Sequence, residues 1–230
     1  MLVSEVMLHQ TQVPRVEAAW AAFIEQFPTP EAMAAAGPGG VIEAWGRLGY
    51  PRRARRLWEC AARIAVEGWP ADLTELPGVG RYTANAVLAQ AEDADLPAVE
   101  VNVRRVVERV AGRRLTERQA EAAMVEVGAP LRGRDRLLAL MDVGSRVCRP
   151  HGPVCDHCPL FDACATRGSL EGAIPRRQAP FEGSFRQSRG VVLARLRGGP
   201  TPIALLDARA LKSLVTDGLA TVDGDTARLP

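Results

Sequence analysis

The sequence predicts an all-α main domain built from antiparallel helices, and three observations lead to this fold class. Apolar residues recur at helical spacing through most of the first 165 residues. The strict alternation of apolar and polar residues that is typical of strands is absent from that stretch. Glycine and proline residues separate the periodic segments. The expected helices are 16–26, 40–45, 52–66, 82–91, 103–110 and 117–127, with breaks at 28–30, 37–40, 68–70, 77–80 and 128–130.

Composition and charge narrow the function classes. The chain has no apolar run of about 18 residues that could span a membrane, and no basic-then-apolar start typical of a secretion signal. We therefore expect a cytoplasmic protein with no membrane partner. The net charge is only +2, but Lys212 is the single lysine, so nearly all positive charge is arginine, which suits phosphate binding. The arginines between residues 47 and 63 form either a DNA-contact surface or a solvated helix face.

The chain divides by composition into an all-α domain at 1–147, a Cys-rich loop at 148–165, a polar linker at 166–187 and a small tail at 188–230. The tail pattern predicts a helix at 189–197, a second helix at 209–217 and a hairpin at 219–229 that turns at Asp223-Gly224. Helix, helix and hairpin is the order of a small winged-helix-like unit.

Four of the five cysteines follow the spacing Cys148-x6-Cys155-x2-Cys158-x5-Cys164. A chain without an export signal is kept reduced, so four close cysteines indicate a metal site and not disulfides. Four thiolates suit either a structural zinc ion or an iron–sulfur cube, and the spacing alone leaves both open.

The string Leu76-Pro-Gly-Val-Gly-Arg-Tyr-Thr83 lies between two expected helices. Gly78 and Gly80 permit backbone conformations that other residues avoid, and they expose N–H groups just before a helix N-terminus. A DNA phosphate fits such a site without any base preference. An ordinary tight turn between helices is the alternative interpretation.

Two further strings carry candidate carboxylates. Val3-Ser-Glu-Val-Met-Leu-His-Gln-Thr-Gln-Val13 contains Glu5, and Val99-Glu-Val-Asn-Val103 contains Glu100. An isolated glutamate on a helix is usually solvated and has no catalytic role. These strings become informative only together with the hairpin and the cysteines.

Taken together, the four strings resemble those of the adenine-specific mismatch DNA glycosylases in the helix-hairpin-helix, endonuclease III superfamily. The resemblance covers roughly residues 1–166. It implies a helix-hairpin-helix glycosylase fold with the hairpin motif at about 72–91 and a [4Fe–4S] cluster held by the four cysteines. It also implies a monomer that acts in base excision repair on double-stranded DNA with a mispaired or oxidised base.

The resemblance assigns chemical roles to the two carboxylates. Adenine leaves well only as a neutral base, and Glu5 stands where the family protonates it. Glu100 stands where an aspartate stabilises the positively charged sugar, as paired carboxylates do in glycoside hydrolysis. The extra methylene of glutamate displaces the oxygens by about 1 Å, a shift that can cost roughly 100-fold in rate. Asn102 is expected to hold the backbone near this loop.

Tyr82 separates two kinds of chemistry. Bifunctional relatives carry a lysine nucleophile at this position, and a Schiff base needs an amine. Tyr82 with a single distant lysine therefore predicts a monofunctional, water-using enzyme. The resemblance also assigns the DNA contacts. Gln10 and Thr11 match the wedge and the partner that touches the opposite base, and Leu48 and Tyr50 match residues that insert near the lesion. The DNA-contact set is completed by Arg52, Gly78, Val79, Gly80 and Arg81.

Some features depart from the family pattern. His9 replaces a glutamine, and Pro51 replaces the second tyrosine of the family string L-G-Y-Y-x-R. The family's usual leading segment with P-W-R and its Nudix-like C-terminal domain have no counterpart among these 230 residues. Leu48 and Tyr50 have core packing as their alternative role. A glycosylase for thymine or uracil opposite guanine, or a catalytically inactive DNA-binding paralogue, thus remain alternative functions.

Overall fold

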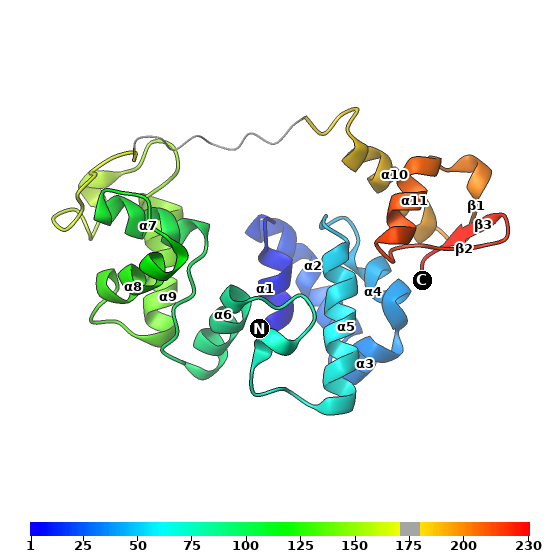
Figure 1. Ribbon diagram of the computed structural model, residues 1–230, viewed down its shortest axis with the longest axis horizontal. Helices are drawn as coiled ribbons and strands as arrows, with labels where there is room; N and C mark the ends of the chain where they lie inside the picture. The colour runs from blue at the N-terminus through cyan, green and yellow to red at the C-terminus, as the bar shows by residue number, and fades with distance from the viewer. Residues whose placement is uncertain (171–179) are drawn as a thin grey trace. The chain divides into compact units, whose positions relative to one another are not determined.

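The computed structural model describes residues 1–170 and 180–230. Residues 171–179, inside the expected linker at 166–187, lie outside the described residues. The chain forms two compact units. The first unit consists of Met1–Leu2 and Val79–Arg176, and the second of Val3–Gly78 and Arg177–Pro230. Helices dominate both units, which confirms the predicted all-α class (Figure 1).

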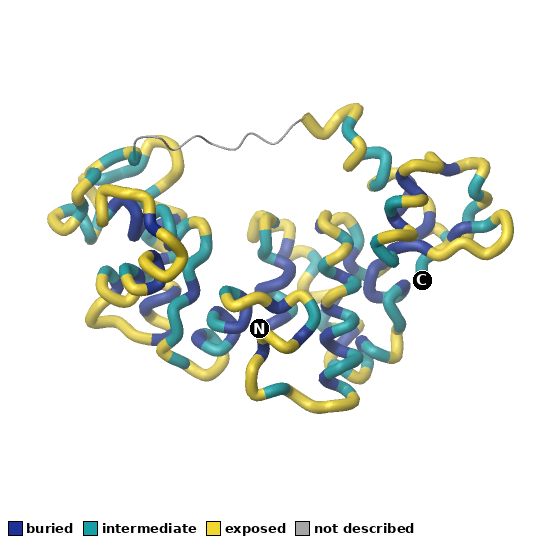
Figure 2. The backbone as a smooth tube through the Cα atoms, in the orientation of Figure 1, coloured by how far each residue is buried: buried dark blue, intermediate teal, exposed yellow. Residues whose placement is uncertain are grey.

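The N-terminal part of the second unit is a group of helices packed around aromatic residues. Helices α3 and α4 lie against α5 (Figure 1). Phe23 and Trp45 are buried and meet edge to face, with their ring centroids 6.1 Å apart. Figure 2 shows buried stretches of backbone within these helices. The elements are α1 (Leu2–Leu8), α2 (Val13–Gln26), α3 (Pro30–Ala35), α4 (Gly37–Trp45), α5 (Arg52–Glu67) and the 3-10 turn η1 (Leu73–Glu75).

The first unit has its own core. Val103, Val106 and Val107 of α7 are buried together with Met124 of α8 and Leu137 of α9. The elements are α6 (Arg81–Glu92), α7 (Val101–Ala111), α8 (Glu117–Val127), α9 (Gly133–Asp142), the π-turn η2 (Val143–Val147) and the 3-10 turn η3 (Cys155–His157).

The C-terminal tail has the expected winged-helix-like order with one additional strand. Its antiparallel sheet has the order β1-β3-β2, and β2 and β3 are joined through the turn at Asp223-Gly224. Strand β1 was not expected from the sequence because it is only two residues long. The elements are α10 (Phe185–Arg197), β1 (Thr201–Pro202), η4 (Ile203–Leu205), α11 (Ala208–Thr216), β2 (Thr221–Asp223) and β3 (Thr226–Arg228).

Several helix boundaries differ from the prediction. The break expected at 37–40 is wrong, because these residues form the first turn of α4. Proline is tolerated there since the first-turn N–H groups have no intrahelical partner. A side chain on Gly39 would collide with the carbonyl oxygen of Pro230, so glycine lets the end of the chain pack on α4.

Three helices were not predicted at all: α1, α3 and α9. Helix α9 shows why. Its first amides are capped from a distant loop, since Asp95 accepts a hydrogen bond from the Gly133 amide at 3.1 Å and Asp93 accepts one from the Arg134 amide at 2.9 Å. The N-cap residue Arg132 makes no side-chain capping bond, so the local sequence does not predict that a helix begins here. None of the helices in the described ranges is long and apolar enough to cross a membrane.

Candidate functional site

Two loops of the second unit carry the predicted base-extrusion residues. Gln10 and Thr11 follow the end of α1, and Leu48 and Tyr50 lie in the loop between α4 and α5. Gln10 has φ 55° and Tyr50 has φ 48°, both in the left-handed region. Each such residue costs about 1–3 kcal/mol, and this strain is concentrated at functional loops in proteins. Leu48 is buried, as its core-packing alternative expects, whereas Tyr50 is 47% exposed.

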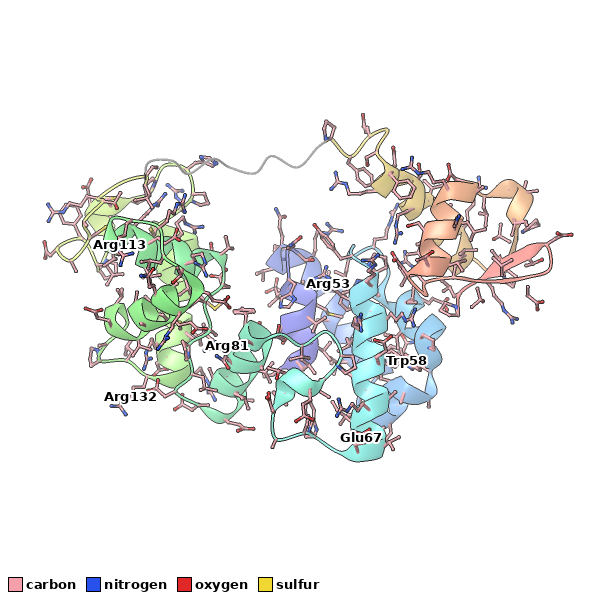
Figure 3. All side chains as sticks on the ribbon, in the orientation of Figure 1. Arg53, Trp58, Glu67, Arg81, Arg113 and Arg132 are labelled. Carbon is pink, nitrogen blue, oxygen red and sulfur yellow. The ribbon has the colours of Figure 1, made fainter. Side chains whose placement is uncertain are left out.

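Arg53 joins these two loops, and the sequence prediction did not include it. Its Nη1 donates to the carbonyl oxygens of Val6 at 2.8 Å, Met7 at 3.2 Å and His9 (Figure 3). Its Nη2 donates to the Thr11 hydroxyl at 3.1 Å. The guanidinium also lies 5.0 Å from the centre of the Tyr50 ring. The last letter of the family string L-G-Y-Y-x-R was the signal that could have identified it.

Arg52, which was the predicted DNA contact, points elsewhere. Its guanidinium forms an ion pair with Asp217 of the tail, although its side chain is 70% exposed. The neighbouring arginines of α5 are paired with glutamates, since Arg55 and Arg56 both contact Glu59. Much of the arginine cluster therefore forms a solvated, ion-paired helix face.

Glu5 lies on α1 and is 5% exposed. His9 follows one turn later. Burial lowers the pKa of His9 below its ordinary value of 6.5; the Glu5 carboxylate raises it, and the Arg53 guanidinium lowers it. The net effect keeps His9 neutral near pH 7. His9 therefore adds no positive charge beside the Glu5 carboxyl group.

Gly78 and Gly80 of the hairpin have different structural roles. Gly78 has φ 78°, and a side chain there would come within 2.9 Å of the Arg56 Cβ. The Cys60 thiol of α5 donates to the Pro77 carbonyl at 3.0 Å, so α5 supports the hairpin. Burial raises the pKa of Cys60 to about 12. Gly80 meets open space and is the N-cap of α6, where exposed amides favour an anion.

The remaining predicted hairpin residues surround this turn. Val79 is buried, and Tyr82 is partly buried against the core of the first unit. Arg81 forms an ion pair with Glu121 of α8 at 2.9 Å and stays largely exposed to solvent (Figure 3). Arg81 thus remains available to a phosphate on its solvent side.

Glu100 is the N-cap of α7. Its Oε1 accepts from the Val103 amide at 2.9 Å, and its Oε2 accepts from the Asn102 side chain at 3.1 Å. The Asn102 oxygen in turn accepts from Arg105 at 2.7 Å, and the Arg105 Nε donates to the Cys148 carbonyl at 2.6 Å. A continuous chain of hydrogen bonds therefore runs from Glu100 to the backbone of the first predicted metal ligand. Gly144 packs directly on Asn102, where a side chain would not fit.

The four predicted metal ligands line one pocket. Arg109, Phe161 and Arg167 complete its wall, and Arg109 donates to the Cys148 sulfur at 3.3 Å. Burial raises the pKa of Cys158; a backbone hydrogen bond at Leu160 lowers it, and the charges of the other thiols raise it. The lining cysteines are Cys148, Cys155, Cys158 and Cys164.

The pocket brings the four cysteines to one place, and both metal alternatives stay open. Among the described residues, no three His, Cys, Asp or Glu side chains converge tightly enough to hold one metal ion. A zinc ion needs its thiolates at about 2.3 Å from a single point. A [4Fe–4S] cube is larger, and each thiolate binds a different corner. Either group would be held by the thiolates of these four residues.

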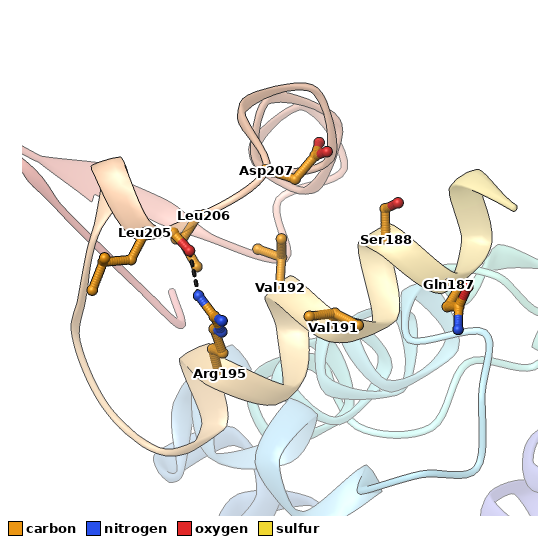
Figure 4. A pocket seen from close by; sticks show the side chains of 8 residues that line it. All are labelled: Gln187, Ser188, Val191, Val192, Arg195, Leu205, Leu206 and Asp207. Carbon is orange, nitrogen blue, oxygen red and sulfur yellow. Dashed lines mark hydrogen bonds between the residues drawn. The ribbon is translucent and has the colours of Figure 1, made fainter. Parts of the chain in front are cut away.

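A further pocket lies in the tail between α10 and the start of α11, with a volume of about 270 Å³ (Figure 4). Gln187, Val191, Arg195 and Asp207 are among its lining residues, and Arg195 donates to the Leu205 carbonyl. It contains none of the predicted catalytic or DNA-contact residues.

The sequence of the chain is similar to those of known DNA repair proteins. Residues 3–130 match the family model of HhH-GPD superfamily base excision DNA repair proteins. The chain is 45% identical over 250 residues to an adenine DNA glycosylase of Mycolicibacterium smegmatis, covering 97% of this chain and 85% of that protein. It is 40% identical to an adenine DNA glycosylase of Mycobacterium tuberculosis, with 97% and 83% covered.

Solved structures share the fold. A thermostable thymine-DNA glycosylase superposes with a TM-score of 0.64 at 25% identity, covering 72% of this chain and 82% of that chain. A trapped endonuclease III–DNA covalent intermediate superposes with a TM-score of 0.63 at 25% identity and the same coverage.

Proposed function

The chain belongs to the HhH-GPD superfamily of base excision DNA repair proteins, and we propose that it is a monofunctional adenine DNA glycosylase. It hydrolyses the bond between adenine and deoxyribose where adenine is mispaired with guanine or 8-oxoguanine in double-stranded DNA. The observation that carries this function is the 45% identity to an adenine DNA glycosylase across nearly the whole chain.

Base extrusion is the task of the second unit. Chemistry on a stacked base requires that the nucleotide leave the helix, and the vacated space must be filled. The loop of Gln10 and Thr11 fills it, and Tyr50 supports the everted nucleotide from the second loop. The hairpin at Gly78–Arg81 binds the phosphate backbone through amides and Arg81, which positions the duplex without reading sequence.

Glu5 and Glu100 divide the chemistry. Glu5 donates a proton to the leaving adenine, so that the base departs neutral. Glu100 places negative charge beside the sugar as positive charge develops there. Asn102 and the Val103 amide fix the Glu100 carboxylate, since each donates to one of its oxygens. The expectation that both carboxylates serve one nucleotide stays a prediction.

The absence of a lysine nucleophile determines the fate of the DNA strand after base release. Tyr82 offers a phenol in place of an amine at the start of α6, and Lys212, the only lysine, lies in α11 of the tail. A Schiff base with the sugar requires a side-chain amine. Water is therefore the nucleophile, and the strand is left intact at an abasic site.

The four thiolates would hold a [4Fe–4S] cluster. When bound, such a cluster supplies a rigid covalent crosslink through four iron–sulfur bonds and a redox-active centre. The protein's own contribution is to fix the loop: Arg109 donates to Cys148, and the Thr166 hydroxyl donates to the Arg109 carbonyl at 2.7 Å.

A single-turnover excision assay on A:G, A:8-oxoguanine, G:T and G:U duplexes tests the function. We expect adenine release from the first two duplexes and strand cleavage only after alkali. Release of thymine or uracil instead would support the alternative function, a glycosylase for thymine or uracil opposite guanine. His9, Glu100 and the fold shared with a thymine-DNA glycosylase permit this alternative. Salt-dependent DNA binding with no base release would identify a non-catalytic DNA-binding protein.

A further inference from the structure

The two strained loops of the second unit share one support. Gln10 and Tyr50 adopt left-handed backbone conformations, which the surrounding structure has to maintain. Neither is a glycine, so neither conformation is favoured by the residue itself. Among the described side chains, Arg53 is hydrogen-bonded to both loops at once: to Thr11 in the first, and to the Gly49 carbonyl at 3.4 Å in the second.

The geometry of the guanidinium suits this role. Arginine has five N–H donors in a fixed planar fork, and here two of its nitrogens serve acceptors on both sides. The carbonyl oxygens of Val6, Met7 and His9 are at the C-terminal end of α1, where helix carbonyls lack intrahelical partners and carry partial negative charge. The guanidinium thus binds the last carbonyls of α1 and the backbone that leads into Gln10 and Thr11.

Aromatic contacts extend the support to the second loop. The guanidinium carbon lies 5.0 Å from the centre of the Tyr50 ring and 5.4 Å from that of Trp45. The Trp45 Nε1 donates to the Gly49 carbonyl at 2.8 Å, so the same short loop is held at two points. Tyr50 therefore rests on the group that also holds Thr11.

The arrangement is costly for folding alone. Burial lowers the pKa of Arg53, and the buried Nε has no hydrogen-bond partner among the described residues. A partly buried charged group with one unsatisfied N–H costs folding free energy, and proteins carry such costs mainly at functional sites.

We propose that Arg53 is a positioning residue that locks the Gln10–Thr11 loop and the Leu48–Tyr50 loop into one rigid wedge for extruding the target nucleotide. This inference rests on the proposed glycosylase function and assigns the step that Arg53 controls. Arg53 does not touch the reacting atoms; it controls whether the nucleotide reaches them.

The test uses the full-length protein and a duplex with 2-aminopurine in place of the target adenine, because the fluorescence of this base rises when it leaves the stack. Arg53→Gln removes the fork, Arg53→Lys keeps the charge but not the fork, and Arg63→Gln is the matched control. Arg63 lies on the same helix and pairs with Glu67 at 2.8 Å and with Glu75 at 3.3 Å.

We expect Arg53→Gln to lose the fluorescence rise and to slow single-turnover excision from A:G by about 100-fold, the scale of a 1 Å misplacement. Arg53→Lys should recover only part of the rate, and Arg63→Gln should match the unaltered protein. Affinity for a fully paired duplex should change by less than about 3-fold, because phosphate contacts dominate that binding.

A second substrate separates positioning from a folding defect. Adenine opposite an abasic site is unpaired and leaves the stack more easily. A wedge defect in Arg53→Gln should therefore be much smaller on this duplex, whereas misfolding lowers both rates equally. Equal loss on both duplexes, or no loss on A:G, overturns the proposal.

Failure of the proposed function gives a different result. Unaltered protein that raises the fluorescence but releases no adenine refutes the glycosylase activity, while the variants still report on Arg53. If the unaltered protein gives no fluorescence rise, it does not extrude the nucleotide, and Arg53 has no extrusion step to control. That result overturns the inference itself.

Discussion

Glu5 is the side chain on which the proposed proton transfer depends. Glu5→Gln keeps the shape and removes the proton, so we expect excision from A:G to fall by about 100- to 10,000-fold, the usual contribution of a general acid. Glu17→Gln, on the exposed face of α2, is the control and should retain the full rate. Single-turnover kinetics measure both. A variant of Glu5 that keeps its rate would remove this residue from catalysis.

Glu100 allows the effect of charge to be separated from that of structure. Its carboxylate both caps α7 and, in our proposal, stabilises the sugar cation. In Glu100→Gln the amide oxygen can still accept from the Val103 amide, but the new NH2 group meets the Asn102 side-chain donor, so stability should fall by the cost of that one hydrogen bond, about 1–3 kcal/mol. The rate should fall by about 100-fold, as when one electrostatic partner of a transition state is lost. A loss of thermal stability well beyond that cost, in parallel with the loss of rate, would instead assign Glu100 a structural role.

His9 gives the protein a pH dependence with a definite sign. Its pKa in the folded state lies below the ordinary 6.5, so the unfolded chain binds the proton more readily. The stability linked to His9 is therefore complete above pH 6.5 and is lost as the pH falls through the depressed pKa. His9→Gln should flatten the decline of the thermal midpoint between pH 7.5 and pH 5.5. Superimposable pH profiles for the two proteins would contradict this prediction.

At the level of elements, a helix was predicted well when the residues that define it are close together in the sequence. A helix whose start depends on residues far away in the sequence was missed. Helix α8 was predicted from its apolar spacing with its observed bounds, and the structure shows that Thr116 and Gln119 cap it within its own first turn. Helix α9 was missed because its caps come from Asp93 and Asp95, about forty residues earlier. The contact of Arg53 with the end of α1 was not predicted either, since helical spacing does not show which arginine turns toward α1.

The tail is attached to α5 through Asp217 at the end of α11. Its carboxylate, 7% exposed, pairs with Arg52 and with Arg189 at 2.6 Å. Burial raises the pKa of Asp217, but the two arginines outweigh burial and hold it below 3.8, so this stability exists above pH 3.8 and is lost below it.

Asp217→Asn should therefore loosen the tail at neutral pH. Hydrogen bonds to charged groups contribute about 1.5–3 kcal/mol, and we expect a loss of that order in the free energy of unfolding. Limited proteolysis should then cleave within residues 185–230 before the rest of the chain is cut. Asp223→Asn, in the exposed turn of the β2–β3 hairpin, is the control. Equal protease resistance of the two variants would show that Asp217 does not hold the tail.

At the scale of the whole molecule, the sequence predicted the fold class and the family but not the division into two units. That division places Glu5 and the wedge loops in one unit, and Glu100 and the cysteines in the other. It depends on which helices pack together over long sequence distances, and hydrophobic periodicity carries no information on pairing. The family strings predicted the family because they consist of functional residues at fixed sequence positions, and they contain no information on helix packing.

The two units also predict separate effects of cluster loss. The purified protein should be brown and absorb near about 400 nm. Cys158→Ser should remove the colour and destabilise residues 79–170, because structural metal sites contribute binding energy directly to folding. Hydrogen exchange should show faster opening of α7 to α9, while α2 to α5 keep most of their protection. Cys60→Ala is the control, since this fifth cysteine lies in the other unit and donates only to Pro77. A colourless unaltered protein with one bound zinc would refute the cluster, and uniform loss of protection would show that the two units unfold as one.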